Sequence, residues 1–268
     1  MIQADLKISL IISVYKNIDF LDIVLRSAER QSYKDFEVII AEDNDGREMA
    51  DFLALVQNRY SFDIMHVFHE DAGFRKTRIL NKAVNVSTGD FLVIIDGDCI
   101  LHRAFLKEYA RQAQDNTCLF GRRMMLSKKL SDTLLNTRDL NRLHLWNILF
   151  SGNRKIEEGI YLPFLRSFRK KGLKGCNLGL PKELLEKING YDEDYEKPWG
   201  GEDSDLERRL RLAGARFKCT KFLTIQYHLY HPILPREVTP DGLDFIDEKK
   251  TSTEWFCRNG LQKNSNSK

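Results

Sequence analysis

Short apolar runs alternate with amphipathic segments along the first hundred residues of the chain. Four runs are rich in β-branched residues, which is typical of buried strands in a parallel sheet; they lie at residues 8–14, 36–43, 62–68 and 91–95. Between them, apolar side chains recur with the spacing of a helix face over residues 17–31, 49–60 and 75–87. This alternation predicts an α/β fold with a parallel, doubly wound sheet and right-handed crossovers.

The pattern in the second half of the chain is less regular. We expect a strand over residues 116–122, helices over 131–150 and 181–188, a strand or turn over 175–179, and strand character over 217–232. Ser204 and Glu207 match a capping box, which predicts a helix that begins there. Glu202 and Asp203 are then expected just outside that helix, after two flexible glycines.

Residues 160–174 combine apolar, aromatic and basic side chains in the sequence IYLPFLRSFRKKGLK. Two interpretations are open for such a segment. One is a solvated helix face beside the core, which we favour, and the other is a patch that contacts a membrane surface.

Polar and acidic residues follow three of the predicted strands where each strand ends. Ser13 and Tyr15 lie at the end of the first, Asp43 at the end of the second, and Asp-Gly-Asp at 96–98 ends the fourth. Because the carboxyl ends of parallel strands share one edge of a sheet, these groups are expected to converge. Asp-Gly pairs favour turns, so a turn is one interpretation of residues 96–98. A site for a cation or for the polar groups of a nucleoside is the other.

Composition narrows the function classes. The chain has 268 residues, 42% of them hydrophobic, which is enough for one large domain or two small ones. Its formal charge of +3 gives no indication of nucleic-acid binding. The five cysteines contain no CxxC pair, which suggests neither a zinc site nor a disulfide framework. With no signal-like segment and no apolar run of membrane-spanning length, we expect a soluble intracellular protein with reduced thiols.

Neither of the common phosphate-binding loops occurs in the sequence. No GxGxxG follows the first strand, and GxxxxGK[ST] is missing. A bound nucleotide therefore needs another counter-charge for its phosphates. A divalent cation on Asp96 and Asp98 supplies one, because Mg²⁺ and Mn²⁺ bind through one or two carboxylates together with phosphate oxygens.

The order of the motifs resembles that of a known family. Asp-x-Asp at 96–98 is followed by Gly-x-Asn at 175–177, Gly-Tyr-Asp-Glu at 190–193 and WGGEDSDLERRLRLAG at 199–214. Together they resemble family-2 glycosyltransferases of the GT-A fold. The later part is similar to the galactosyltransferase-like C-terminal module of chondroitin synthases and β-1,4-galactosyltransferases. The resemblance covers roughly residues 8–232, and residues 199–214 are its most specific part.

The resemblance implies a role for each matching residue. Asp203 is expected to be the catalytic base, with Glu202 beside it to bind the acceptor or donor sugar. The expected nucleotide-sugar-binding residues are Ser13, Tyr15, Asp43, Arg78, Asp96, Gly97, Asp98, Asn177 and Trp199. The expected metal ligands are Asp96, Asp98, His231 and, as a second histidine, His228. The second strand ends Glu-Asp-Asn-Asp where the family often has Asp-Asp-Gly-Ser, so the ribose contacts depart from the pattern.

These roles imply a metal-dependent, inverting transfer of a hexose or N-acetylhexosamine from a UDP-sugar, with Mn²⁺ or Mg²⁺ as cofactor. The acceptor is expected to be a hydroxyl of a saccharide or lipid-linked saccharide. Residues 1–122 are expected to form the nucleotide-sugar-binding half of a single GT-A domain. Residues 123–268 are expected to form its acceptor-binding and catalytic half, with a flexible tail from about residue 240.

The expected setting is bacterial, because the signal anchor common in eukaryotic Golgi enzymes is missing. We expect a role in surface polysaccharide or lipopolysaccharide synthesis in the cytoplasm or at the inner face of the cytoplasmic membrane. The segment 140–174 is predicted to govern the acceptor and to make peripheral membrane contact, because it joins four aromatic with four basic side chains: Trp146, Phe150, Phe164, Phe168, Arg166, Arg169, Lys170 and Lys171.

Two other classes provide alternatives. Aspartyl-phosphate phosphatases also end an apolar strand in Asp-x-Asp, but on an early strand, whereas three βα units precede residues 96–98 here. A non-catalytic carbohydrate-binding subunit would require a broken set of site residues, and every expected carboxylate is present. Metal-dependent release of UDP from a UDP-sugar separates these classes.

Overall fold

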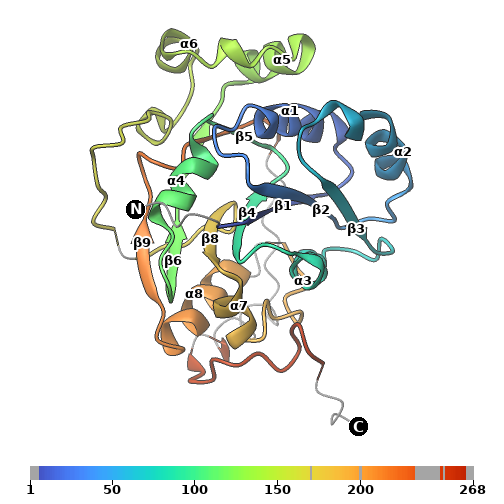
Figure 1. Cartoon of the computed structure of the whole chain (residues 1–268), viewed down its shortest axis with the longest axis vertical. Coiled ribbons are helices and arrows are strands. Elements are labelled where there is room, and N and C mark those ends of the chain that lie inside the picture. The colour runs from blue at the N-terminus through green and yellow to red at the C-terminus, as the bar shows by residue number, and fades with distance from the viewer. Residues whose placement is uncertain (1–5, 170, 199–200, 233–247, 250, 264–268) are drawn as a thin grey trace.

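The computed structural model describes residues 6–169, 171–198, 201–232, 248–249 and 251–263 (Figure 1). Across these ranges the centre of the molecule is a seven-stranded sheet in the order β3-β2-β1-β4-β8-β6-β9. Its strands are β1 (Ile8–Val14), β2 (Phe36–Glu42), β3 (Ile64–Phe68), β4 (Phe91–Asp96), β6 (Thr117–Phe120), β8 (Asn177–Pro181) and β9 (Arg216–Cys219). β8 runs antiparallel to both neighbours, and the other pairs are parallel. The predicted α/β fold with a mostly parallel sheet is confirmed.

Helices lie on both sides of this sheet (Figure 1). One side holds α1 (Ile18–Glu29), α2 (Arg47–Val56), α4 (Phe105–Gln112), α5 (Lys128–Thr137) and α6 (Leu145–Phe150). The other side holds α3 (Lys76–Val86), α7 (Lys182–Lys187) and α8 (Glu202–Leu212). Successive strand residues point to opposite faces, so Leu10 and Val93 enter the first core while Ile11 and Ile94 enter the second. Because a core covers each face of the sheet, apolar and polar residues do not alternate along the strands.

A small second sheet, in the order β5-β10-β7, lies beside the end of β4. Its strands are β5 (Cys99–Leu101), β7 (Met124–Met125) and β10 (Gln226–His228). In the antiparallel pair of β10 with β5, His228 stands opposite Cys99. The sheet therefore brings a histidine from the end of the chain to the Asp-Gly-Asp motif.

Two expectations for the middle of the chain are wrong. The helix expected over 131–150 is split, because Arg138 adopts a left-handed φ of 53° and ends α5. The Asp139 side chain then caps a short 3₁₀ turn, Leu140–Arg142, before α6 begins. The described residues of 160–174 contain no helix.

The C-terminal residues 248–249 and 251–263 pack against the loop that precedes α8. The remainder of the expected tail, residues 240–247, 250 and 264–268, lies outside the described residues. No helix in the described part of the chain is both long and apolar enough to cross a membrane.

Candidate active site

The Asp-Gly-Asp motif is held at the carboxyl edge of the sheet by backbone hydrogen bonds. Gly97 N–H donates to the Ser13 carbonyl at the end of β1 (2.8 Å), and Leu229 N–H donates to the Asp98 carbonyl (2.9 Å). His228 Nε2 and His231 Nε2 lie 3.1 and 3.2 Å from Asp98 Oδ2. Two expected metal-binding histidines thus meet the expected carboxylate.

These three residues form a donor set that fits a divalent transition metal. One carboxylate oxygen and two imidazole nitrogens lie within 4.8 Å of one another. Burial alone would raise the pKa of Asp98, but its hydrogen bonds with His228 and His231 outweigh burial and hold the pKa well below its usual range. The hydrogen bond with Asp98 raises the pKa of His231. A carboxylate oxygen and two imidazole nitrogens together can bind a divalent metal ion.

Asp96 makes different contacts from Asp98. Its two oxygens contact Lys76 Nζ at 2.6 Å and Arg123 Nη1 at 3.0 Å. Asp96 is not part of the donor set that Asp98 forms with the two histidines among the described residues. Its expected role as a metal ligand stays a prediction.

The helix that carries the expected base begins earlier than the sequence predicts. α8 starts at Glu202, and Gly201 precedes it with a φ of 91°, a conformation that favours glycine. Glu207, the expected capping-box partner, instead accepts the backbone N–H of Gly172 (3.0 Å) and of Leu173 (2.8 Å). The expectation that Glu202 and Asp203 lie outside the helix is therefore wrong. They occupy its first turn, where the positive end of the helix favours carboxylates.

Asp203 is packed against the chain at Gly175. A Cβ atom at residue 175 would lie 2.3 Å from Asp203 Oδ1, so a larger residue would displace the carboxylate. Burial raises the pKa of Asp203, while Lys76 and the Gly175 N–H act against that rise. Burial and the neighbouring charge of Asp203 raise the pKa of Glu202. Both carboxyls are thus better proton acceptors than exposed ones when ionised.

Lys76 links the two groups of carboxylates. Burial alone would lower its pKa, but the charges of Asp96, Asp203 and Glu202 outweigh burial and raise it. Sequence reasoning misses both Lys76 and Arg123. Lys76 stands in the basic run 75–78, from which only Arg78 was selected, and nothing in the sequence shows which of those side chains faces the strand ends.

The expected nucleoside contacts lie along the same strand ends but are spread out. Asp43 is buried, 2.6 Å from His69 Nε2, and accepts the Arg75 N–H at 2.8 Å. Tyr15 is 56% exposed, with its hydroxyl 3.3 Å from Asp71. Arg78 is directed toward Glu193, 3.9 Å away.

Asn177 lies opposite Ile95 of β4, the residue before Asp96, and its side chain is buried. It has 0% exposure; its side chain accepts from the Tyr109 hydroxyl (2.5 Å) and donates to the carbonyls of Arg122 and Thr224. These bonds join β8 to its surroundings and leave no polar atom for a sugar. Trp199 lies outside the described residues.

Two families match this chain. Residues 9–176 match glycosyl transferase family 2, and residues 163–232 match the N-terminal domain of galactosyltransferase. This chain belongs to glycosyl transferase family 2. The predicted family and the galactosyltransferase-like later module are confirmed, and the match favours glycosyl transfer over the phosphatase alternative.

Two glycosyltransferases from bacteria are similar to this chain at low sequence identity. Validoxylamine A glucosyltransferase of Streptomyces hygroscopicus is 22% identical over 77% of this chain and 52% of its own length. Amylovoran biosynthesis glycosyltransferase AmsB of Erwinia amylovora is 26% identical over 39% of this chain and 35% of its own length. The chain spans about half or less of the length of these curated relatives.

Solved structures share the fold. TarS 1-349 of S. aureus in complex with UDP-GlcNAc superposes with a TM-score of 0.62 at 15% identity, covering 91% of this chain and 66% of that one. The mannosyltransferase PcManGT from Pyrobaculum calidifontis, in complex with GDP-Man and Mn²⁺, gives 0.54 at 17% identity, covering 83% and 56%. The predicted GT-A fold is confirmed.

Proposed function

We propose that this family-2 glycosyltransferase moves a hexose or N-acetylhexosamine from a UDP-sugar to a hydroxyl of a saccharide or lipid-linked saccharide. The proposal rests on two groups of side chains that lie in one site. Asp98 with its two histidines lies beside Asp96, and Asp96 is joined through Lys76 to Glu202 and Asp203. The name of the amylovoran biosynthesis glycosyltransferase AmsB supports a role in bacterial polysaccharide synthesis, and we propose a surface polysaccharide or lipopolysaccharide as the product.

The donor side of the reaction requires stabilisation of the departing diphosphate. A bound Mn²⁺ or Mg²⁺ ion supplies positive charge there. Asp98, His228 and His231 would hold that ion, with Asp98 kept ionised by its histidine partners. Lys76 and Arg123 add two fixed positive charges at Asp96, next to the same strand end.

On the acceptor side, Asp203 would remove the proton from the attacking hydroxyl. Lys76 favours the ionised form of Asp203, and the hydrogen bond from Gly175 holds the carboxylate in place. Attack from the face opposite the diphosphate gives direct displacement and inversion at C1. Glu202, in the same helical turn, would bind hydroxyls of the reacting sugars.

The acceptor is proposed to reach the site along residues 140–174, in contact with the inner face of the cytoplasmic membrane. Trp146, Phe150, Phe164 and Phe168 are all exposed. Residues 159–181 contain five Lys or Arg residues and no acid, which suits an anionic surface. Lys170, one of the five, lies outside the described residues.

The membrane contact is tested by co-sedimentation with liposomes that contain anionic lipid. Replacing Arg166, Arg169, Lys170 and Lys171 together by Gln is expected to reduce binding at least tenfold at low salt, because each cation near such a surface is worth about 1 kcal/mol. Neutral liposomes serve as the control. Equal binding of wild type and variant to anionic liposomes would contradict the membrane contact.

Catalysis is tested by measuring UDP release from a panel of UDP-sugars with Mn²⁺ and a saccharide acceptor. We expect acceptor-dependent release that EDTA abolishes. A protein that binds UDP-sugar but never releases UDP would be the non-catalytic subunit.

A further inference from the structure

Residues 248–249 and 251–263 form a segment that we call the C-terminal strap. Both family matches end before it, at residues 176 and 232. Backbone hydrogen bonds tie the strap to the chain just before α8: Cys257 N–H donates to Ile188, Leu261 N–H to Asn189, and Glu193 N–H to Asn259. The Asn189 side chain donates to the carbonyls of Cys257 (2.6 Å) and Gln262 (3.0 Å). The strap therefore follows the loop of residues 189–195 closely.

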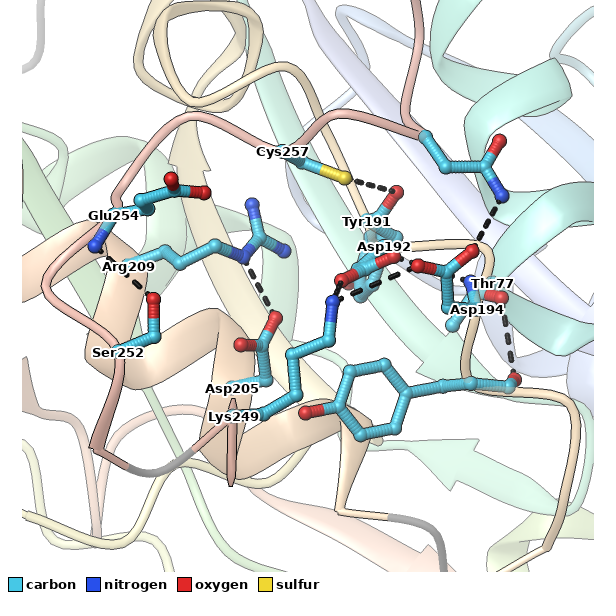
Figure 2. Close-up of polar contacts among 12 residues, drawn as sticks. Thr77, Tyr191, Asp192, Asp194, Asp205, Arg209, Lys249, Ser252, Glu254 and Cys257 are labelled. Carbon is cyan, nitrogen blue, oxygen red and sulfur yellow. Dashed lines mark hydrogen bonds and ion pairs between the residues drawn. The ribbon is translucent and has the colours of Figure 1, made fainter. Parts of the chain in front are cut away.

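Charged side chains reinforce this attachment (Figure 2). Lys249 reaches between two acids of the loop, 2.5 Å from Asp192 Oδ2 and 3.6 Å from Asp194 Oδ2. Asp192 is only 5% exposed, and a buried carboxylate without a cationic partner would be costly to the fold. The Asn259 side chain donates to Asp194 Oδ1 at 2.7 Å.

The loop that the strap holds lies between the two helices of the candidate active site. On the α3 side, Asn81 donates to the Tyr191 carbonyl (2.9 Å) and accepts the Tyr191 N–H (2.8 Å). On the α8 side, Arg209 donates to the Gly190 carbonyl (2.8 Å) and pairs with Asp205 at 2.6 Å. α3 carries Lys76, and α8 carries Glu202 and Asp203.

The strap also contacts α8 directly. Arg208, in the second turn of the helix, donates to the backbone carbonyls of Ser252 (2.7 Å) and Glu254 (3.0 Å). α8 is thus held by the strap itself and by the loop that the strap fixes.

We propose that the C-terminal strap is a positioning element of the active site, with Lys249 as its main anchor. By fixing the loop 189–195, it sets the separation between Lys76 on α3 and the two carboxylates at the start of α8. The expected effect on kcat rests on the proposed function, whereas the expected effect on the positions of α3 and α8 does not. Catalytic groups are sensitive to such a change, since a displacement of about 1 Å can reduce a rate by about 10²-fold.

The test uses the full-length chain with Lys249→Met, which keeps the length of the side chain and removes its charge. Lys249→Arg is the rescue variant, because arginine restores a cation for Asp192 and Asp194. Arg258→Ala is the matched control. Arg258 also lies in the strap, but it pairs with Glu254 of the strap itself, and the two side chains are 80% and 59% exposed.

Hydrogen exchange of the ligand-free protein gives the first readout. We expect Lys249→Met to speed amide exchange in residues 189–198 and 201–203 about tenfold or more, while β1 and β4 keep their wild-type rates. Lys249→Arg should restore slow exchange, and Arg258→Ala should leave it unchanged. Unchanged exchange in residues 189–198 and 201–203, or faster exchange spread evenly over β1 and β4, would overturn the positioning role.

Kinetics with a UDP-sugar give the second readout. Lys249→Met should lower kcat by about 10- to 100-fold and change the donor KM less than kcat, because Asp98, His228 and His231, the residues proposed to hold the metal ion, lie outside the loop that the strap fixes. A wild-type kcat in a variant with fast loop exchange would overturn the link to catalysis. If Lys249→Met does not fold, Asn259→Ala, which removes the bond to Asp194 and leaves Lys249 in place, takes over both readouts. An inactive wild type would reject the proposed function and leave the exchange result standing.

Discussion

Replacing Asp203 with asparagine should abolish most transfer without harming the fold. Asparagine keeps the shape of the side chain and an oxygen that can accept the Gly175 N–H, but it cannot accept the proton of the acceptor hydroxyl. Removal of a general base costs about 10²–10⁴ in rate, which corresponds to about 2.7–5.5 kcal/mol of transition-state stabilisation. We expect kcat to fall by that factor.

The same substitution should not lower stability at neutral pH. The folded-state pKa of Asp203 is raised, mainly by burial, so the ionised carboxylate is disfavoured in the folded protein relative to the unfolded chain. The stability linked to its protonated form is present at low pH and is lost as the pH rises through the folded pKa. A neutral asparagine avoids this loss. The thermal midpoint of Asp203→Asn at pH 7 should therefore equal or exceed that of wild type.

Steady-state UDP release, calorimetry with UDP and Mn²⁺, and thermal unfolding together check this prediction. UDP affinity should stay within about threefold of wild type, because Asp98, His228 and His231 lie on other elements. Ser204→Ala, an exposed position in the same helical turn, serves as the control and should keep full activity. A near wild-type kcat for Asp203→Asn would refute the assignment of the base and make Glu202 the next candidate.

Two further substitutions test the rest of the site. Asp98→Ala should abolish the Mn²⁺-dependent part of UDP binding in calorimetry while the circular dichroism spectrum is kept, and an unchanged Mn²⁺ effect would remove Asp98 from the metal site. Lys76→Met should lower activity and move the acidic limb of the kcat/KM profile to higher pH, because Lys76 holds down the pKa values of Asp203 and Glu202. A limb that stays in place would show that Lys76 does not act on these carboxylates.

Elements set by local pattern were predictable from the sequence. The strands β1, β2 and β4 are mostly apolar on both faces because both faces of the sheet are covered, and the end of β4 locates the Asp-Gly-Asp motif. The pairing of Asp98 with His228 and His231 was expected through the family resemblance. Periodicity alone could not supply it, since His228 ends β10 and His231 follows it, more than 120 residues after Asp98 in the chain.

Features decided by distant partners were not predictable. Ser204 and Glu207 have the spacing of a capping box, yet Glu207 bonds to backbone N–H groups at Gly172 and Leu173, which lie some 35 residues away in the chain. Arg138 ends α5 where its guanidinium pairs with Asp19 and Asp22 of α1, and no local signal marks that break. Tertiary contacts override local propensity in both places.

The sequence also could not show which of the neighbouring basic residues of α3 faces the strand ends. The family resemblance implies a role for Arg78, which stays a prediction; in the structure Arg78 is directed to Glu193, and Lys76, which the resemblance does not single out, contacts Asp96. Two residues of helix rotate a side chain by more than half a turn, so the direction depends on how α3 packs on the sheet. The contacts of Lys249 with the loop before α8 depend in the same way on the folded chain.

Transfer of sugar from radiolabelled sugar nucleotides directly tests metal-dependent transfer from a UDP-sugar with Asp203 as the base. Each nucleotide is supplied singly with Mn²⁺ and a saccharide acceptor, to the wild type and to Asp203→Asn. We expect a labelled glycoside from at least one UDP-hexose or UDP-N-acetylhexosamine, no product after chelation of the metal, and a loss of about 10²–10⁴ in rate for the variant. Product formed only from a GDP-sugar, or formed equally well without divalent metal, would contradict this expectation.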